Sequence, residues 1–408
     1  MNRKQFLDGY DGRRQTIYGN ALDSLHAKEI VRSDSYVKFF VKCEKINFSK
    51  KLDPAPRGIS PRNPRYHVSL GPYIKRIEKK IYKLIAEIYQ APTVFKGFNV
   101  KQSGKWMRKH WDDFVDPVAV GLDASRFDQH TSKEALKYEH MFYKAFYPND
   151  VKLRKLLNWQ LNNKGFGNVP DGRIKFEIEG ARMSGDMNTG LGNCLLMCAM
   201  IHSYAKPRFT KFRLANNGDD CVLFVERQEL SKMDDLSDWF TELGYTMKME
   251  DPVDIFERIE FCQTQPVWTP DGWIMVRQVP LHTSKDCLSI KPIDNPKVLR
   301  KWCKAIGQCG MSLTGGIPIS QDFYQKLQDI AGNVKPLEDP TLWTGFKQMS
   351  VGMDRHYQPV DDRTRLSFYK AFGIDAVAQR VFEKRFRDSY FDCSKRAVDQ
   401  DIHWMPMY

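Results

Sequence analysis

The sequence predicts an α+β fold with an antiparallel central sheet. Two observations support this prediction. Short apolar runs separated by turn sequences are typical of β-hairpins, and stretches with apolar residues at helical spacing lie between them. The 408 residues, of which 42% are hydrophobic, suffice for two or three domains with a sizeable core. This composition excludes a disordered chain and a disulfide-stabilised mini-domain.

The first part of the chain combines a basic loop with a basic helix. Residues 74–89 predict an amphipathic helix that packs on the core, with a membrane-surface or partner helix as the alternative. Prolines and glycines in residues 54–66 predict an extended loop, because they interrupt a helix. Such a loop would present Arg57, Arg62 and Arg65 to phosphate groups, unless it is an ordinary basic surface loop.

The rest of the chain alternates between strands and helices. Strands are expected in six apolar runs, over residues 115–122, 173–179, 212–217, 221–226, 259–268 and 273–277. Helices are expected over residues 188–204 and 231–243, and around residues 374–382. This mixture of hairpins and helices is typical of an α+β domain.

Positive charge is concentrated at one end of the chain. Lys and Arg outnumber Asp and Glu by 63 to 50 overall and by 24 to 9 within residues 1–110, so the remainder is nearly neutral. This asymmetry suggests a polyanion such as nucleic acid as the partner of the basic end. A membrane surface or simple solubility would also account for it.

Cysteine usage and hydropathy exclude further classes of protein. Nine cysteines without a C-x-x-C pair indicate a reducing compartment and argue against a zinc or disulfide framework. Residues 1–14 are polar and charged, unlike a signal peptide. The longest apolar run, residues 194–201, is far shorter than the roughly 20 residues that a membrane-spanning helix needs. The sequence therefore predicts no transmembrane segment.

Four aspartates occupy the ends of predicted strands. Asp123 follows an apolar run, Asp128 comes five residues later, and Asp219 and Asp220 lie in a Gly-Asp-Asp turn. Carboxylates gathered in this way repel one another unless a cation joins them, and their hard oxygens favour Mg²⁺ or Mn²⁺. Two such ions are what an in-line phosphoryl transfer requires. Each element alone is unspecific, because a Gly-Asp-Asp turn also occurs in ordinary hairpins.

The order of these residues resembles the palm of a viral RNA-dependent RNA polymerase. GLDASRFDQH (residues 121–130), SGDMNTGLGN (184–193) and NNGDDCVLF (216–224) are similar to its first three motifs. The separations of about 60 and then about 30 residues also match. The segments LGYTMK and IEFCQ, which follow, resemble the fourth and fifth motifs.

The resemblance extends toward the N-terminus and is closest to one virus group. VKCEK (residues 41–45), together with Pro56 and Arg57, resembles the basic motif of the polymerase fingers. The phrases PRNPRY, GDMNTGLGNCLLMCAM and IEFCQT are most similar to the tombusvirus-like group of plus-strand RNA viruses, the carmovirus relatives. The resemblance is strong over residues 10–290 and looser beyond.

The resemblance implies a role for each of the polar motif residues. Asp123 and Asp219 would bind two Mg²⁺ or Mn²⁺ ions, and Asp220 would assist them. Asp128 and Asn188 would form a hydrogen-bonded pair that senses the ribose 2′-OH, with a helix cap as the alternative for Asn188. A site that bonds this hydroxyl rejects a deoxynucleotide, because its polar groups are then left unpaired.

The resemblance also implies contacts to nucleotide and RNA. The nucleotide-binding residues would be Ser184, Gly185, Thr189, Lys42, Lys45 and Arg57. The RNA-binding residues would be Arg62, Arg65, Cys262 and Gln263, with a core position as the alternative for Cys262. Lys248 would act as the general acid for the pyrophosphate, with an ordinary surface lysine as the alternative.

In such a polymerase the α+β fold is a right hand with fingers, palm and thumb. The fingers would be residues 1–114 and 136–180. The palm would be residues 115–135 and 181–280 and would consist of an antiparallel sheet flanked by helices. The thumb would be residues 281–408 and would be mostly helical. The substrates would be NTPs, a single-stranded RNA template and nascent RNA, without need of a primer. The partners would be a viral membrane-anchoring replicase protein and host factors. The chain would act in membrane-associated replication complexes of the host cytoplasm. It would reach these complexes through its partners or through missing upstream residues.

Three alternatives remain open from the sequence. A non-catalytic RNA-binding component of a replicase would use the same basic surface but would not need the polar motif residues. A reverse transcriptase or DNA polymerase is opposed by Asp128, where the resemblance implies a bulky aromatic residue for reverse transcriptases. The third alternative is a polymerase fragment that is inactive alone, because the chain begins close to the fingers motif.

Overall fold

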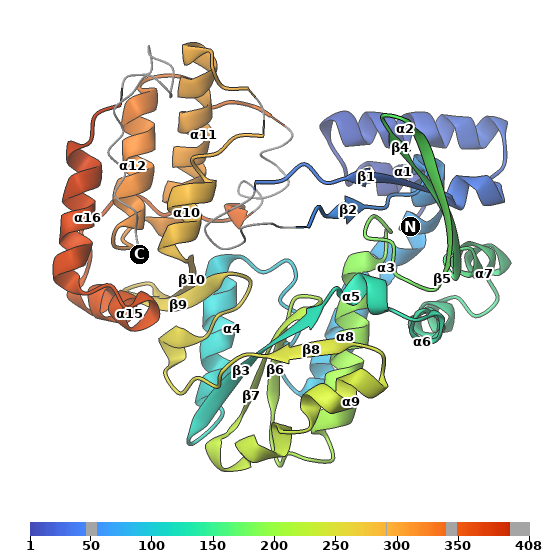
Figure 1. Cartoon of the computed structure of the whole chain (residues 1–408), viewed down its shortest axis with the longest axis horizontal. Helices are drawn as coiled ribbons and strands as arrows, with labels where there is room; N and C mark the ends of the chain where they lie inside the picture. Colours follow the sequence, from blue (N-terminus) through green and yellow to red (C-terminus); the bar gives the residue numbers. More distant parts are fainter. Residues whose placement is uncertain (46–54, 291, 340–348, 392–408) are drawn as a thin grey trace. The chain divides into compact units, whose positions relative to one another are not determined.

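The computed structural model describes residues 1–45, 55–290, 292–339 and 349–391, so parts of the predicted loop, fingers and thumb ranges lie outside the described residues. The chain forms two compact units, each assembled from segments that are distant in the sequence (Figure 1). The first unit contains Met1–Lys42, Ala55–Lys96 and Phe114–Pro252, and the second contains Cys43–Pro54, Gly97–Asp113 and Val253–Tyr408. Both units contain helices and antiparallel strand pairs, which confirms the predicted mixture of α and β structure.

A four-stranded antiparallel sheet lies at the centre of the first unit. Its strands in spatial order are β6 (Arg213–Asn216), β7 (Asp220–Glu226), β3 (Pro117–Ser125) and β8 (Thr246–Met249). The strands predicted around residues 115–122, 212–217 and 221–226 are confirmed, with shifted ends. β3 is buried along most of its length, which explains its nearly continuous apolar sequence.

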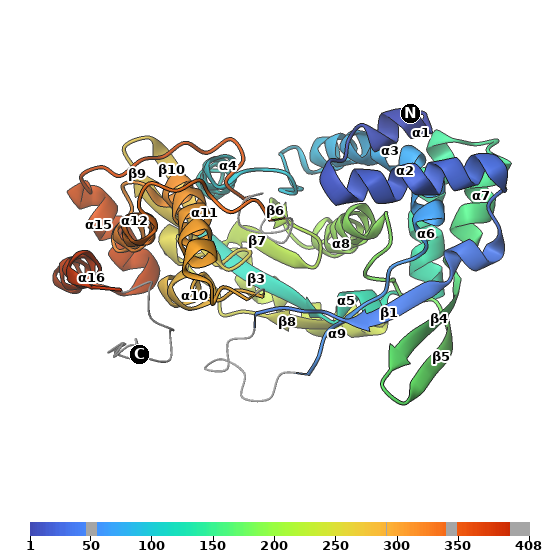
Figure 2. The same cartoon turned by 90° about the horizontal axis from the view of Figure 1, so that it is seen from above.

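A second sheet of the first unit combines one parallel with two antiparallel strand pairs. Its strands in spatial order are β2 (Gly58–Ile59), β1 (Val37–Val41), β4 (Asn162–Val169) and β5 (Gly172–Glu179). β1 and β4 are the parallel pair. β4 and β5 form a hairpin that projects from the unit (Figure 2), and β5 confirms the strand predicted over residues 173–179.

The 26-residue helix α3, Pro64–Tyr89, buries one face in the first unit. Ile74, Ile77, Ile81 and Ile85 are at most 5% exposed, so the core-packed interpretation of this helix is confirmed. The helix begins well before the predicted start at residue 74, because Asn63 caps it and proline is compatible with a first turn. The predicted loop before it is correspondingly shorter.

Further helical segments surround the two sheets. They are α1 (Arg3–Leu7), α2 (Gly12–Ala27), η1 (Arg32–Ser35), α5 (Phe127–His130), α6 (Lys133–Phe146), α7 (Val151–Asn158), α8 (Thr189–Ala205), η2 (Arg227–Met233) and α9 (Leu236–Glu242). α8 contacts α3, α6 and β6 and is mostly buried, as expected for a helix that is apolar on nearly all sides. The predicted helix over residues 231–243 is shorter than expected, because its first part is a 3₁₀ turn in which Glu229 binds Thr210 and Lys232.

The second unit is mainly helical. Its elements are α4 (Val100–Asp112), η3 (Phe256–Arg258), β9 (Thr264–Thr269), β10 (Gly272–Arg277), α10 (Val279–Lys285), α11 (Pro296–Thr314), α12 (Ser320–Ala331), α15 (Asp362–Phe372) and α16 (Ala376–Asp388). α4 packs so closely on β10 that a Cβ at Gly104 would overlap the carbonyl group of Trp273. Trp302, Phe323 and Tyr324 form part of the core between α11 and α12. Within the described residues, none of the helices combines the length and the apolar sequence that crossing a bilayer requires.

Candidate active site

The central sheet of the first unit sets the predicted carboxylates side by side. In the register of the sheet, Asp123 of β3 lies opposite Asp220 of β7 on one side and opposite Lys248 of β8 on the other. Directly opposed residues point to the same face of a sheet, with Cβ atoms about 5 Å apart. Asp123 and Lys248 are exposed and Asp220 is partly exposed, so this face is accessible to a ligand.

Asp219 lies in the turn that joins β6 to β7. The buried Asn216 holds this turn, because its Nδ2 donates to the Gly218 carbonyl at 2.7 Å and its Oδ1 accepts from the Gly218 N–H at 3.2 Å. The Asn217 N–H donates to the Asp220 carbonyl at 2.9 Å. Gly218 has a φ of +96°, which a side chain would disfavour, so the turn requires this glycine. The exposed Asp219 is thereby fixed beside Asp220.

The three carboxylates are suitable ligands for a divalent metal ion. Carboxylate oxygens are the hard donors that Mg²⁺ and Mn²⁺ prefer, and Asp123, Asp219 and Asp220 carry them on adjacent backbone segments. Among the residues that the structure describes, no three His, Cys, Asp or Glu side chains are arranged as a preformed metal centre. The three carboxylates therefore suit such an ion by their chemistry and by the strand register, although they do not form a preformed metal centre.

Asp128 pairs with a residue that the sequence interpretation missed. Its Oδ1 accepts a hydrogen bond of 2.8 Å from Asn193 Nδ2 on helix α8. The prediction that Asp128 pairs with Asn188 is therefore wrong. Burial raises the pKa of Asp128, the Asn193 hydrogen bond opposes this rise, and the negative charge of Asp219 adds to it. Asp128 thus lies close enough to the carboxylates to respond to their charge.

Asn193 also carries an unsatisfied hydrogen-bond acceptor. The residue is 7% exposed, and its Oδ1 is buried without a hydrogen-bond partner in the described part of the chain. Its Cβ would lie 3.7 Å from a Cβ built at Gly218, so the side chain lies against the Gly-Asp-Asp turn. A buried polar atom without a partner costs about 1–3 kcal/mol, which a ligand hydroxyl at this position would relieve.

Asn188 belongs instead to a buried polar network beneath the site. Its Nδ2 donates to Glu139 Oε1 at 2.6 Å, and its Oδ1 accepts from Gln160 Nε2 at 2.8 Å. Although Asn188 occupies the N-cap position of α8, its side chain makes no capping hydrogen bond, so the alternative interpretation as a helix cap is also wrong. The side-chain amide of Asn188 therefore forms its hydrogen bonds with buried groups inside the protein.

The same network contains a buried ion pair between Arg182 and Glu139. Both side chains are fully buried, and the backbone N–H of Arg182 donates to the Asp128 carbonyl at 2.7 Å. Burial raises the pKa of Glu139, but the charge and hydrogen bond of Arg182 outweigh this effect and hold the pKa below its ordinary value. The ion pair therefore connects the interior of the unit to the backbone that carries Asp128.

The segment before α8 is held against the N-terminal part of the unit. Ser184 Oγ accepts a hydrogen bond of 3.1 Å from the Ser60 N–H, and Gly185 forms a β-bridge with Pro61. A Cβ at Gly185 would lie 2.6 Å from the Pro61 Cα, so another residue would displace the backbone. Thr189 Oγ1 donates to a carbonyl of the same segment at 3.0 Å. These contacts give Ser184, Gly185 and Thr189 a defined position at the start of α8.

Two of the predicted RNA-binding arginines are occupied inside the protein. Arg62 is 4% exposed, and its guanidinium pairs with Asp186 and donates to Asn163 Oδ1 at 2.7 Å. Arg65 lies in the first turn of α3 and pairs with Asp34 at 3.0 Å. The prediction that an extended loop presents these arginines to phosphate groups is wrong, because internal carboxylate and carbonyl groups already bind them.

The predicted triphosphate-binding residues are divided between the two units. Lys42 and Arg57 belong to the first unit, where the Lys42 N–H donates to the Arg57 carbonyl at 2.7 Å. Lys45 belongs to the second unit, where its Nζ donates to the Lys285 carbonyl at 2.8 Å and burial lowers its pKa. The structure thus sets Lys42 beside Arg57, whereas Lys45 is bound to a different unit.

Cys262 and Gln263 lie in the second unit and form a turn. Their φ angles are +53° and +61°, and Phe261 and Thr264 exchange backbone hydrogen bonds of 2.9 and 3.0 Å around them. Two left-handed residues in such a loop are typical of a type I′ turn. The strand predicted over residues 259–268 therefore begins only after this turn. Cys262 is half-buried and Gln263 is exposed.

Comparison with known proteins places this arrangement in a family. A family model described as viral RNA dependent RNA polymerase matches residues 1–394. The chain belongs to this family. The RNA-directed RNA polymerase of tobacco necrosis virus (strain A) is 48% identical over 404 residues, which cover 98% of this chain and 55% of the relative. Those of tomato bushy stunt virus (strain Cherry) and turnip crinkle virus are 46% and 41% identical, covering 93% and 96% of this chain and 46% and 51% of the relatives.

The viral polymerase family agrees with the resemblance seen in the sequence. The tombusvirus-like character of the motifs is confirmed by these relatives. Members of the family generally use divalent metal ions, in agreement with the carboxylate donors of the central sheet. The chain spans about half the length of the curated relatives it matches.

The sequence of this polymerase-family chain contained a signal for Asn193. It is an isolated polar side chain in the otherwise apolar run of residues 191–201. A polar group in a buried helix requires a partner, which separates Asn193 from its neighbours. Glu139 and Arg182 had no comparable local signal, because charged residues are ordinary on the surface of helices and loops.

Acid should weaken this viral polymerase fold through His140. His140 Nε2 lies 3.1 Å from Gln160 Oε1, and burial lowers the pKa of His140 from 6.5 to about 4. Because the folded state keeps the neutral ring, this contribution to stability is complete above pH 6.5 and is lost as the pH falls toward 4, by about 3 kcal/mol. Urea unfolding at pH 7 and pH 4 measures the loss.

The control for this expectation is an exposed histidine. His140→Gln should lose less stability between pH 7 and pH 4 than the wild type, whereas His26→Gln, on the surface of α2, should lose as much. Burial also lowers the pKa of His67 to about 4, so the wild-type loss should exceed the part due to His140. Equal losses in the two variants would contradict the role of His140.

Proposed function

We propose that this chain is an RNA-directed RNA polymerase that replicates the genome of a plus-strand RNA virus. It would transfer nucleotidyl groups from NTPs to the 3′-OH of RNA and would initiate without a primer. The observation that carries the proposal is the strand register that sets Asp123 beside Asp220 and Lys248, with Asp219 in the adjoining turn. Membership of the viral polymerase family supports the same reaction.

The carboxylates of the central sheet would hold the metal ions of this reaction. Asp123 and Asp219 would bind two Mg²⁺ or Mn²⁺ ions, with Asp220 assisting. Such ions lower the pKa of an attacking hydroxyl and neutralise negative charge on a leaving pyrophosphate. Lys248, on the strand next to Asp123, would give a proton to the pyrophosphate.

The other contacts to substrate follow from the family resemblance and from position. Ser184, Gly185 and Thr189 would contact the template and the incoming nucleotide at the start of α8. Lys42, Lys45 and Arg57 would hold the triphosphate. Cys262 and Gln263 would lie beside the primer strand. The backbone hydrogen bond between Lys42 and Arg57 keeps these two residues adjacent, which supports a shared role for them.

We assign a right-hand architecture on the same basis. The palm would comprise residues 115–135 and 181–280, which include the strands of the central sheet. The fingers would comprise residues 1–114 and 136–180, including the second sheet, and the thumb would be residues 281–408. The strands of the central sheet and their carboxylates all belong to the first unit, which supports the part of this palm before residue 253.

The proposed polymerase would work with partners in the host cell. A viral membrane-anchoring replicase protein and host factors would bring it to membrane-associated replication complexes in the cytoplasm. Imaging of the tagged chain with and without the other viral replicase protein tests this part of the proposal. Membrane association that is independent of any partner would contradict it.

A primer-free extension assay on single-stranded RNA tests the proposed activity. We expect template-dependent RNA product with Mg²⁺ or Mn²⁺ and none when the metal is removed by EDTA. A folded chain that binds the template but makes no RNA under any of these conditions would contradict the proposal. Such a result would favour the RNA-binding component or the inactive fragment instead.

Asn193→Ala should relax the choice of sugar. Asn193 positions Asp128, and its free Oδ1 is the acceptor for a ribose 2′-OH in the proposed site. A lost hydrogen bond that leaves a buried polar group unpaired costs about 1–3 kcal/mol, or roughly 5- to 150-fold in rate. The ratio of kcat/KM for an rNTP and its matching dNTP should fall by a factor in this range, measured by single-nucleotide incorporation.

Asn188→Ala is the matched control for this substitution. Asn188 is buried near the start of the same helix but bonds to Glu139 and Gln160 inside the protein. Its loss should lower the melting temperature without moving the sugar ratio. A ratio that changes in Asn188→Ala and not in Asn193→Ala would refute the assignment and favour the pairing expected from the sequence.

A further inference from the structure

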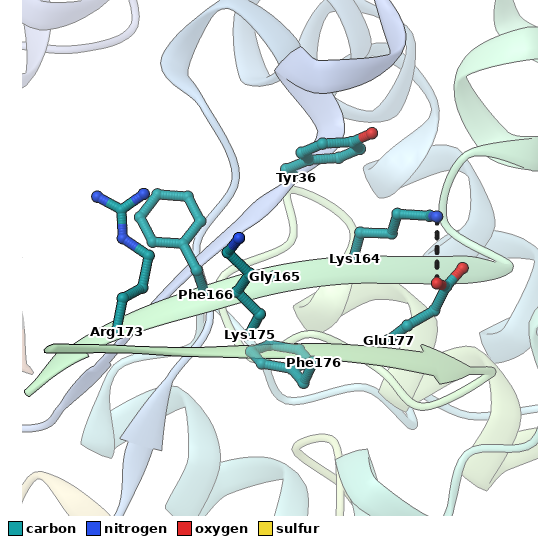
Figure 3. Close-up of a pocket in the computed structure, with 8 residues that line it drawn as sticks. All are labelled: Tyr36, Lys164, Gly165, Phe166, Arg173, Lys175, Phe176 and Glu177. Atoms are coloured by element: carbon teal, nitrogen blue, oxygen red, sulfur yellow. Dashed lines mark ion pairs between the residues drawn. The ribbon is translucent and has the colours of Figure 1, made fainter.

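A hollow of about 520 Å³ lies on the second sheet of the first unit, along the β4–β5 hairpin. Figure 3 shows the side chains around it, which come from both strands of the hairpin and from Tyr36 just before β1. In the register of the sheet, Phe166 of β4 lies opposite Lys175 of β5 and beside Lys38 of β1. One face of three adjacent strands therefore carries an aromatic ring between two lysines.

The aromatic rings of this hollow are accessible. Tyr36 is 36% exposed and Phe166 is partly exposed. The guanidinium of Arg173 lies over the Phe166 ring, with its central carbon 4.6 Å from the ring centroid. An exposed ring that is stacked with a planar cation offers the kind of surface on which a nucleobase stacks.

The charge of the hollow is positive. Lys164, Arg173 and Lys175 line it together with a single carboxylate, that of Glu177. Lys164 pairs with Glu177 at 3.1 Å, and Arg173 Nε donates to Asn168 Oδ1 at 3.2 Å. Lys175 has no ion-pair partner within the described ranges of the chain. At least two positive charges are thus left for an anionic ligand.

We propose that this hollow binds single-stranded RNA, with unpaired bases stacked on Phe166 and Tyr36 and phosphate groups held by Lys175 and Arg173. Accessible rings among cations favour RNA over an acidic peptide, because every base offers a π face and every linkage a phosphate. The inference rests on the proposed function, in which RNA is the substrate. The chain leaves β5 at Glu179 and reaches Ser184 five residues later, so the hollow is continuous in sequence with the proposed active site.

Equilibrium binding of a labelled oligouridylate, measured by fluorescence anisotropy without NTPs or metal, tests the inference. Phe166→Ala should weaken binding roughly 5- to 150-fold, the effect of losing one stacked base, and Phe166→Trp should retain it. Lys175→Gln should lower the slope of log affinity against log salt by about 0.7, the value for one single-strand phosphate contact.

The matched control lies on the same strand. Ile174→Ala removes a side chain that is 59% exposed and points to the opposite face of β5, between Arg173 and Lys175. Its affinity for the oligouridylate should equal that of the wild type. Unchanged affinity in Phe166→Ala would overturn the inference, and so would an equal loss for single-stranded and duplex RNA, because duplex bases cannot stack on a protein ring.

The same measurements separate this inference from the proposed function. A chain that makes no RNA but loses oligouridylate affinity in Phe166→Ala would contradict the polymerase activity alone and support the RNA-binding hollow. If the chain copies its template and Phe166→Ala binds the oligouridylate as tightly as the wild type, the RNA-binding role of the hollow is contradicted and the polymerase activity is not.

Discussion

Asp219→Asn should reduce RNA synthesis by about 10³-fold or more and leave template affinity unchanged. The substitution keeps the size of the side chain and removes the charge that would hold the ions, whose stabilisation of the transition state is worth several kcal/mol. The turn should persist, because Asn216 and Gly218 hold it through bonds that do not involve the Asp219 side chain. Extension at saturating NTP concentration measures the rate, and filter binding measures template affinity.

Asp238→Asn is the matched control for Asp219→Asn. Asp238 is an exposed aspartate of helix α9 in the same unit, so the variant loses the same charge away from the carboxylates of the central sheet. We expect its synthesis rate to remain within about twofold of the wild type, as for ordinary surface substitutions. Rapid synthesis by Asp219→Asn would remove Asp219 from the metal site.

Arg182→Met should destabilise the first unit by about 3–5 kcal/mol. The substitution leaves Glu139 as a buried charge without its cation, and an uncompensated charge in the interior is costly. The effect should reach the site, because the backbone of Arg182 is bonded to Asp128. Urea unfolding at pH 7 measures the change in free energy.

Two further variants distinguish the buried ion pair from a general loss of charge. Lys137→Met breaks an exposed pair with Glu134 and should cost less than about 1 kcal/mol. The double substitution Arg182→Met with Glu139→Gln removes both charges and should recover a large part of the lost stability. If Arg182→Met were as stable as Lys137→Met, the ion pair would have no structural role.

Local sequence signals predicted the carboxylates of the central sheet well. Asp123 follows an apolar strand, and Asp219 and Asp220 occupy a turn that requires glycine, so their neighbours alone place them at strand ends. The helix α8 and the strand β5 were predicted from local signals of the same kind. Periodicity and turn residues act over a few positions, which a single sequence displays directly.

Partners that are distant in the sequence were not predictable in this way. The pairing of Asp128 depends on the rotation of α8, and Asn193 is displaced from Asn188 by about 140° around a helix of 3.6 residues per turn. Arg62 looked like a loop residue because its partner Asp186 is far along the chain. Whether a charged side chain binds solvent, RNA or protein is decided by tertiary packing.

The pair of Arg62 with Asp186 also constrains the order in which the chain can fold during synthesis. The two residues are 124 positions apart. At a translation rate of about 5–20 residues per second, Arg62 is synthesised roughly 6 to 25 seconds before Asp186. Burying the arginine in that interval would leave its charge unpaired, which is strongly unfavourable. We therefore expect Arg62 to be buried only after the segment before α8 has been made.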